Sequence, residues 1–274
     1  MDERPRRTAD ELVRLARIAY DAGDHAEAEA LARRALMLSP ASVDARQVAA
    51  SAVIEQGRYG EAIPWLEELL EEDPRDVVTL ADLGLCLFEL CEFEDAEAVL
   101  ARALEIDPSD PQASYWMGLC IERRGETKLA EECFLRAHSV DPEAYPRPVR
   151  WSAEEFDDAV EEAAADLPPA MREALDRLEL VVRDLPDEED LLAFDPPLDP
   201  CLYGLFPGIP LPDREDDADP EPDVLYLYKR NLERMCPGFD VLVRELRLTL
   251  LYEIGHYLGL DGVALAEEEE RGRT

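Results

Sequence analysis

Two side chains with the spacing of metal ligands lie near the C-terminal end of the chain. Residues four apart share one face of a helix, so Tyr252 and His256 would face the same way, with Glu253 beside the first of them. In the pattern HExxH, two His at this spacing hold one Zn²⁺, and the Glu acts as general base on a metal-bound water. The segment therefore predicts Glu253 as the catalytic base and His256 as a zinc ligand, with Tyr252 where the first His would be.

A third ligand is expected just beyond the helix. Gly259 is predicted to end the helix in a left-handed cap, after which the chain turns back and offers Asp261. Tyr252 remains the other candidate, but a neutral phenol is a poor zinc ligand, and ionising it is costly because its reference pKa is near 10. The other two His, His25 and His138, lie in a different kind of sequence. The sequence thus suggests zinc as the cofactor and leaves catalysis open.

A structural role for His256 is the simpler alternative. A single His on an apolar helix is more often a partly buried side chain that hydrogen-bonds to a neighbour, here Glu253 or Tyr203. Other chemistries have less support. No Gly-rich loop opens a helix as a phosphate site requires, and Ser152 is the one Ser among residues 143–274.

The elements that would position this motif form a small α+β domain. Its last helix is predicted over 239–258, and an amphipathic helix over 151–166 carries Phe156 and Val160 at helical spacing. A Pro-Pro break precedes a second helical stretch that runs through Leu175. Short runs rich in β-branched and aromatic residues predict three strands, at 178–184, 202–206 and 224–228.

The first half of the chain is periodic, with a period of 34 residues. Three sets of markers repeat in one phase over four copies: Gly23, Gly57, Cys91 and Gly125; Ala28, Ala62, Ala96 and Ala130; Pro40, Pro74, Pro108 and Pro142. Small residues allow two helices to approach closely, and Pro ends the second helix of each copy. Residues 7–142 resemble the tetratricopeptide repeat, which implies an α-helical solenoid.

This resemblance implies a protein or peptide partner, bound in a concave groove lined by the first helix of each repeat. By analogy with the family, the groove would present Arg17, Tyr20, Leu85, Phe88, Tyr115 and Leu119. The Lys and Asn clamp that some members use for a C-terminal carboxylate is not recognisable, which favours an apolar or mildly basic ligand. The open alternative is that the array packs on its own C-terminal domain or self-associates.

A Pro-marked linker at 143–150 leads to a second resemblance, over residues 151–266, before a charged tail at 267–274. The helix near Phe156, the run Leu-Tyr-Gly-Leu-Phe-Pro-Gly-Ile-Pro-Leu at 202–211, the strand at 224–228 and the motif helix occur in the order of a small bacterial family of zincin-like metallopeptidases. The resemblance implies Glu253 as general base, His256 as a zinc ligand and Asp261 as a possible third ligand. An active peptidase, another metal-dependent activity and a non-catalytic scaffold all remain open.

Charge limits the partners. The chain has 65 acidic and 28 basic residues, a formal net charge of −37, which disfavours nucleic acid and anionic lipid. No segment approaches the ~18 apolar residues of a membrane span, and no apolar stretch follows the basic N-terminal residues. The six Cys lack paired spacing and are predicted to be reduced thiols, so we expect a cytoplasmic protein.

Overall fold

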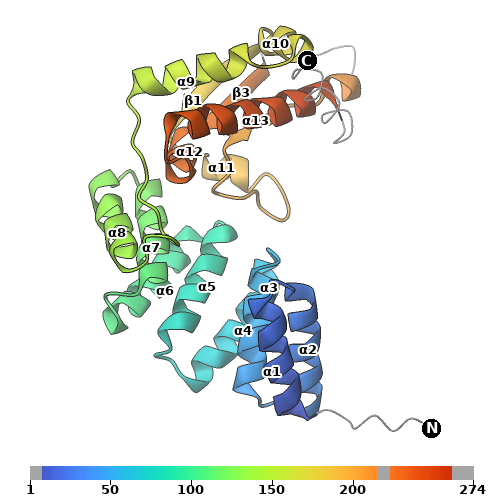
Figure 1. The fold of residues 1–274 in the computed structure, drawn as a ribbon, viewed down its shortest axis with the longest axis vertical. Helices are drawn as coiled ribbons and strands as arrows, with labels where there is room; N and C mark the ends of the chain where they lie inside the picture. The colour runs from blue at the N-terminus through green and yellow to red at the C-terminus, as the bar shows by residue number, and fades with distance from the viewer. Residues whose placement is uncertain (1–7, 215–222, 261–274) are drawn as a thin grey trace, which may run out of the picture. The chain divides into compact units, whose positions relative to one another are not determined.

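The computed structural model describes residues 8–214 and 223–260. The chain divides into two compact units, Met1–Tyr145 and Pro146–Thr274, which Figure 1 colours from blue to green and from green-yellow to red. The division falls within the predicted linker at 143–150.

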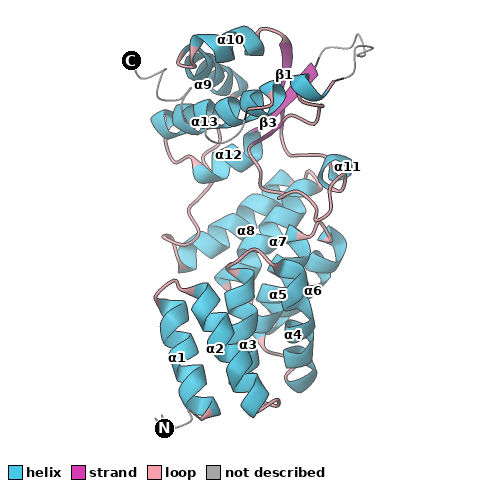
Figure 2. Ribbon diagram, turned by 90° about the vertical axis from the view of Figure 1, so that its right-hand side faces the viewer, coloured by secondary structure: helices cyan, strands magenta, loops and turns pink. Residues whose placement is uncertain are grey.

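The first unit is an array of helical hairpins. Its helices are α1 (Ala9–Asp21), α2 (His25–Leu38), α3 (Val43–Ile54), α4 (Tyr59–Glu72), α5 (Val77–Glu89), α6 (Phe93–Ile106), α7 (Pro111–Arg123) and α8 (Thr127–Val140). Each helix packs on the next along the chain, and first helices of neighbouring hairpins also touch, as α1 does with α3 and α5 with α7. Figure 2 shows the array as helices and loops alone. The predicted four-hairpin solenoid is confirmed.

Backbone conformation explains the repeated Gly. Gly23, Gly57 and Gly125 have φ of 77°, 70° and 76°, and Cys91, at the same repeat position, has φ of 63°. A Cβ built at any of these three Gly would meet no atom within 4 Å. The turn therefore favours Gly for its left-handed conformation, which Cys91 also adopts, and not, as the sequence suggested, for close helix packing.

Close packing instead uses two other Gly, one repeat apart. A Cβ at Gly84 would lie 2.5 Å from Leu100 Cγ, and one at Gly118 would lie 2.7 Å from Phe134 Cε1. Each contact joins the first helix of a hairpin to the second. Any larger side chain would push the two helices apart.

Each first helix begins at a side-chain cap. Thr8, Ser42, Asp76 and Asp110 lie one repeat apart, and their side-chain oxygens accept hydrogen bonds from backbone N–H groups of the first helical turn. Such a cap satisfies a donor that the helix leaves unpaired and contributes about 1 kcal/mol. This fourth periodic marker was missed in the sequence.

The second unit packs helices against a three-stranded sheet. Its elements are α9 (Ala153–Ala165), α10 (Pro169–Leu175), β1 (Leu178–Arg183), α11 (Glu188–Leu191), β2 (Gly204–Leu205), a 3-10 turn (Leu211–Asp213), β3 (Asp223–Tyr228), α12 (Lys229–Met235) and α13 (Phe239–Leu258). The strand order is β1-β3-β2, with β1 parallel and β2 antiparallel to β3. The α+β prediction is confirmed, whereas α11 and α12 were not predicted.

The core of this unit joins α9, α13 and the sheet. Phe156 of α9, Leu246 and Leu250 of α13, and Leu225 and Leu227 of β3 belong to one buried cluster. Figure 1 shows α9 running beside α13, with β1 and β3 behind. Helix α13 is therefore anchored along its length on one side, while its other side can carry the motif.

Hydrogen bonds hold the start of the second unit, and a glycine cap ends its last described helix. Glu233 of α12 is buried, and its carboxylate accepts hydrogen bonds from Arg150 and from the backbone N–H of Trp151, at 2.8 and 3.0 Å. At the other end, Gly259 caps α13 with φ of 68°, as the sequence predicted. The end of the predicted linker is thus tied to the second unit.

Two general features follow from the described residues. None of their helices has the length and apolar character that crossing a membrane requires. The six Cys all lie in these residues, none of them forms a disulfide, and five are buried.

Candidate functional site

The motif on α13 lies against the end of β2. The Glu253 carboxylate accepts a hydrogen bond of 2.8 Å from the backbone N–H of Phe206, which directly follows β2. Strand and helix come close because residue 204 is Gly: a Cβ there would lie 2.6 Å from Thr249 Cγ2. The predicted general base therefore has a structural partner, the loop after β2.

Burial is the main influence on the Glu253 carboxyl. It raises the pKa of Glu253 above its usual value, while the Phe206 N–H and the nearby His256 act in the opposite direction. A carboxyl group with a raised pKa takes up and releases protons closer to neutral pH. This property suits an acid–base catalyst, but it is equally a consequence of packing a carboxylate beneath a loop.

The other two helix-borne candidates point outward. The Tyr252 side chain is 58% exposed, and His256 is exposed as well. The His256 ring meets the Phe206 ring edge to face, with centroids 5.8 Å apart. The alternative of a partly buried His256 is therefore wrong, since the ring lies at the surface beside Phe206.

These donors do not fit a three-ligand zinc site within the part of the chain that the structure describes. Residues 8–214 and 223–260 contain no group of three His, Cys, Asp or Glu side chains that could hold a metal ion. Tyr252 supplies a phenol in place of imidazole, and the carboxylate of Glu253 is engaged by the Phe206 N–H. Asp261, the predicted third ligand, lies outside the described residues.

A second candidate site is a groove in the first unit, on the face formed by the first helices. Its main part has a volume of about 450 Å³ and is lined by α1, α3, α5, α7 and the segment after α8, with Tyr20, Glu55, Asp82, Leu85, Tyr115 and Tyr145 among the lining residues. A smaller adjoining pocket of about 280 Å³ shares Tyr20 and includes Arg17. Four of the six predicted groove residues thus line these cavities.

The other two predicted groove residues are buried, so their assignment to the groove surface is wrong. Phe88 is 1% exposed and Leu119 is 2% exposed. Phe88 packs against Phe93 and Trp116, with ring centroids 5.2 and 5.4 Å apart. Both side chains point between helices because neighbouring hairpins close over them, so neither can contact a ligand directly.

Aromatic rings gather at one end of the groove. Tyr115 lies 5.2 Å from Tyr145 and 5.9 Å from Trp116, centroid to centroid. Tyr145 belongs to the segment that was predicted to be linker, so nothing in the sequence placed it in the groove. Burial raises the pKa of Tyr145, and carboxylates including Asp110 and Asp82 add to that effect.

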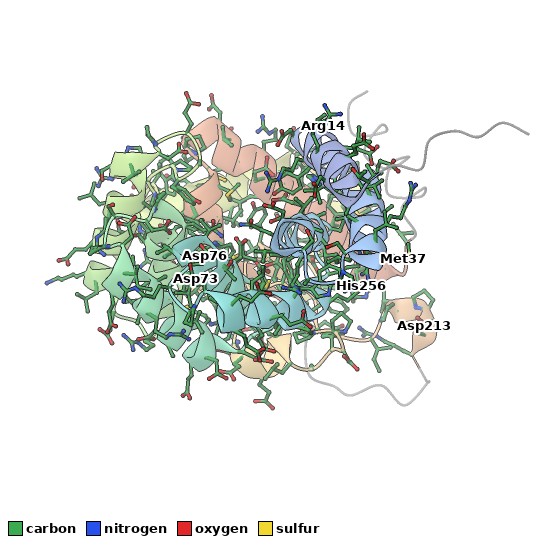
Figure 3. The ribbon with its side chains drawn as sticks, turned by 90° about the horizontal axis from the view of Figure 1, so that it is seen from below. Arg14, Met37, Asp73, Asp76, Asp213 and His256 are labelled. Carbon is green, nitrogen blue, oxygen red and sulfur yellow. The ribbon has the colours of Figure 1, made fainter. Side chains whose placement is uncertain are left out.

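Carboxylates are the groove feature that sequence analysis missed. Asp82 accepts a 2.8 Å hydrogen bond from Gln112, and burial raises its pKa to about 6, with Asp76, Glu55 and Asp110 acting in the same direction. Asp76 is the cap of α5, and Figure 3 labels it next to Asp73 at the turn before that helix. Gln112 follows Asp82 by 30 residues, four fewer than the 34-residue repeat. This spacing could have suggested that the two side chains meet on adjacent first helices.

The fold defines a helical-hairpin repeat array of the tetratricopeptide type, followed by a small mixed α/β unit. Comparison with family models agrees with this class. Residues 19–76 and 53–120 match the tetratricopeptide repeat, and residues 175–271 match the family described as zincin-like metallopeptidase. The chain therefore carries tetratricopeptide repeats and a zincin-like metallopeptidase family domain. The latter match begins after α9, although α9 shares the core of that unit.

Solved structures that resemble the chain include several forms of MamA. One is MamA from residue 41 to its end from Desulfovibrio magneticus RS-1, at 21% identity over 48% of this chain and 75% of that chain, with a TM-score of 0.45. YrrB, titled a TPR protein with an unusual peptide-binding site, matches at 19% identity over 49% of this chain and 70% of that chain, with a TM-score of 0.44. Among proteins of curated function, none matches.

Proposed function

We propose that this chain is a non-catalytic interaction protein that binds a segment of a partner protein in the groove of its repeat array. The groove itself carries the proposal. A cavity of about 450 Å³ lined by aromatic, amide and carboxylate side chains offers both apolar contact and hydrogen bonds to an extended peptide. In this proposal the zincin-like unit is a retained scaffold.

The contacts of Glu253 support a scaffold role for the second unit. Glu253 Oε2 accepts the Phe206 N–H, at 2.8 Å, and so holds the loop after β2 against α13. This contact gives the carboxylate a structural role that needs no metal or substrate. Tyr252, at the position of a zinc-binding His, adds a phenol that binds Zn²⁺ poorly unless it is ionised.

A zinc-dependent metallopeptidase is the second candidate. It is favoured by the family match over residues 175–271 and by the burial that raises the Glu253 pKa. Under this alternative, His256 and Asp261 would hold the metal and Glu253 would be the base. Zinc would supply the acidity that activates a bound water.

Metal content and hydrolysis distinguish the two candidates. For protein purified without added metal, we expect far less than one zinc per chain by mass spectrometry. We also expect no difference between wild type and Glu253→Gln in cleavage of an unstructured casein-like peptide, because removing a general base slows only an existing reaction, typically by 10² to 10⁴.

Tyr252→His is the matched gain-of-ligand variant. It recreates HExxH, so a latent metal site would bind zinc at least tenfold more tightly, about 1.4 kcal/mol. Tightly held equimolar zinc in the wild type, together with hydrolysis that Glu253→Gln abolishes, would contradict the scaffold proposal and establish the second candidate.

A further inference from the structure

The charged side chains that line the main cavity of the groove are acidic. In the part of the chain that the structure describes, this cavity is lined by the carboxylates Glu55 and Asp82 and by no Lys, Arg or His. Two further carboxylates, Asp76 and Asp110, lie close enough to raise the pKa of Asp82 by repulsion. Among the described residues, none that lines the main cavity offsets this negative charge, and Arg17 of the adjoining pocket pairs with Asp44.

Aromatic side chains flank these carboxylates. The Tyr20 hydroxyl donates a 3.2 Å hydrogen bond to Glu55, and Tyr115, Trp116 and Tyr145 line the same cavity. Aromatic faces attract cations, with about 0.5–2 kcal/mol per contact depending on solvent exposure. Carboxylates beside such faces form an environment that suits a guanidinium or ammonium group on an apolar stem.

Building on the proposed peptide-binding function, we infer that the groove selects basic segments, and that Asp82 and Glu55 pair with an Arg or Lys side chain of the partner. A cation between these carboxylates would relieve their mutual repulsion and form charge-assisted hydrogen bonds. The aliphatic stem would lie along Leu85 and the aromatic rings. An acidic segment would meet repulsion from four carboxylates, and an apolar one would leave them buried without a counter-charge.

The hydrogen bond from Gln112 orients Asp82 without neutralising it. Gln112 Nε2 donates to Oδ1 at 2.8 Å, and a carboxylate oxygen has further lone pairs for a second donor. Because Asp82 lies on α5 and Gln112 on α7, the bond also fixes the relative position of these neighbouring helices. Asp82 is therefore preorganised to receive a ligand.

The test uses the full-length chain and three fluorescein-labelled nonapeptides that differ at two positions. The first has the sequence Gly-Leu-Arg-Ala-Leu-Arg-Ala-Leu-Gly, the second replaces each Arg with uncharged citrulline, and the third replaces each Arg with Glu. Binding is measured by fluorescence polarisation at about 0.15 M salt, where long-range attraction to the acidic surface is screened. We expect the Arg peptide to bind at least tenfold more tightly than the citrulline peptide.

Single variants locate the binding. Asp82→Asn and Glu55→Gln should each weaken binding of the Arg peptide about tenfold, a typical loss for one charge pair. Asp95→Asn, which makes the same charge change at an exposed position on α6, should change it less than twofold. Thermal melts of each variant separate loss of binding from loss of fold.

The outcomes also separate this inference from the proposed function. Equal binding of the Arg and citrulline peptides, weakened by Tyr115→Ala, would overturn the basic selectivity and keep the peptide-binding groove. An Arg preference that Asp95→Asn reduces as much as Asp82→Asn would show general surface attraction and would also overturn it. If none of the three peptides binds even at millimolar concentration, both the inference and the groove function fail.

Discussion

Asp82 in the repeat array and Glu253 in the zincin-like unit are both partly buried carboxylates whose pKa is raised mainly by burial. Their partners differ. Asp82 receives a hydrogen bond from the Gln112 side chain and faces other carboxylates in an open groove, whereas Glu253 receives one from the backbone N–H of Phe206 and lies beside His256. A raised pKa thus identifies a buried acid, and only its neighbours indicate whether that acid binds a ligand or holds a loop.

The largest expected losses of folding stability come from replacing buried aromatic rings near the two carboxylates. Phe206, 1% exposed, carries the N–H that Glu253 accepts, and Phe88 packs under Trp116 of the groove wall. We expect Phe206→Ala and Phe88→Ala each to cost about 3–5 kcal/mol, because each leaves a cavity in a packed core. Urea unfolding followed by circular dichroism measures the loss.

Exposed apolar residues provide the matched controls. Phe194→Ala in the second unit and Leu129→Ala in the first remove side chains that are 48% and 46% exposed, so they should cost less than about 1 kcal/mol. A Phe88→Ala variant with wild-type stability and weakened peptide binding would mean that Phe88 reaches the ligand, as the sequence first suggested.

A smaller effect is expected at Glu253. Glu253→Ala removes the acceptor of the Phe206 N–H and should cost about 1–3 kcal/mol. Glu253→Gln keeps an acceptor oxygen and should lose less. Hydrogen exchange at the Phe206 amide should accelerate in the Ala variant and much less in the Gln variant; equal exchange in both would argue that the carboxylate does not hold this loop.

The smallest effect is expected at Asp82, and it has the opposite sign. Burial, with Asp76, Glu55 and Asp110, raises the folded-state pKa of Asp82 to about 6, above its unfolded value of 3.8. The folded state therefore binds the proton more tightly, and this contribution to stability, complete below pH 4, is lost as pH rises through about 6. Asp82→Asn should thus raise stability at pH 7 by about 1–2 kcal/mol, since each unit of pKa shift is worth about 1.4 kcal/mol before solvent screening.

The measurement is thermal unfolding at pH 4 and pH 7. At pH 4 the Asn variant and wild type should differ little, and Asp95→Asn should have a small effect at both pH values. If Asp82→Asn is more stable than wild type but binds the Arg peptide more weakly, then Asp82 serves binding at the expense of stability. Loss of stability at pH 7 would instead mean that Asp82 is a purely structural partner of Gln112.

The sequence determined the features that depend on neighbouring residues. The 34-residue period predicted the helical hairpins. Helix α13 has the predicted bounds, Phe239–Leu258, with Gly259 in the left-handed cap. The three strands also lie where β-branched and aromatic runs predicted them. Helix periodicity, turn conformation and capping are local preferences, so they can be read from adjacent residues.

Tertiary structure decided which side chains meet. The partner of Glu253 is 47 residues away, and Asp82 and Gln112 are 30 residues apart. Helix α12 was not predicted, and its buried Asn231 donates hydrogen bonds to the carbonyl oxygens of Pro200 and Leu202, which are distant in sequence. Residues on one helix face look alike in sequence, and only the packing of adjacent hairpins determines that Leu85 lines the groove while Phe88 is enclosed beneath it.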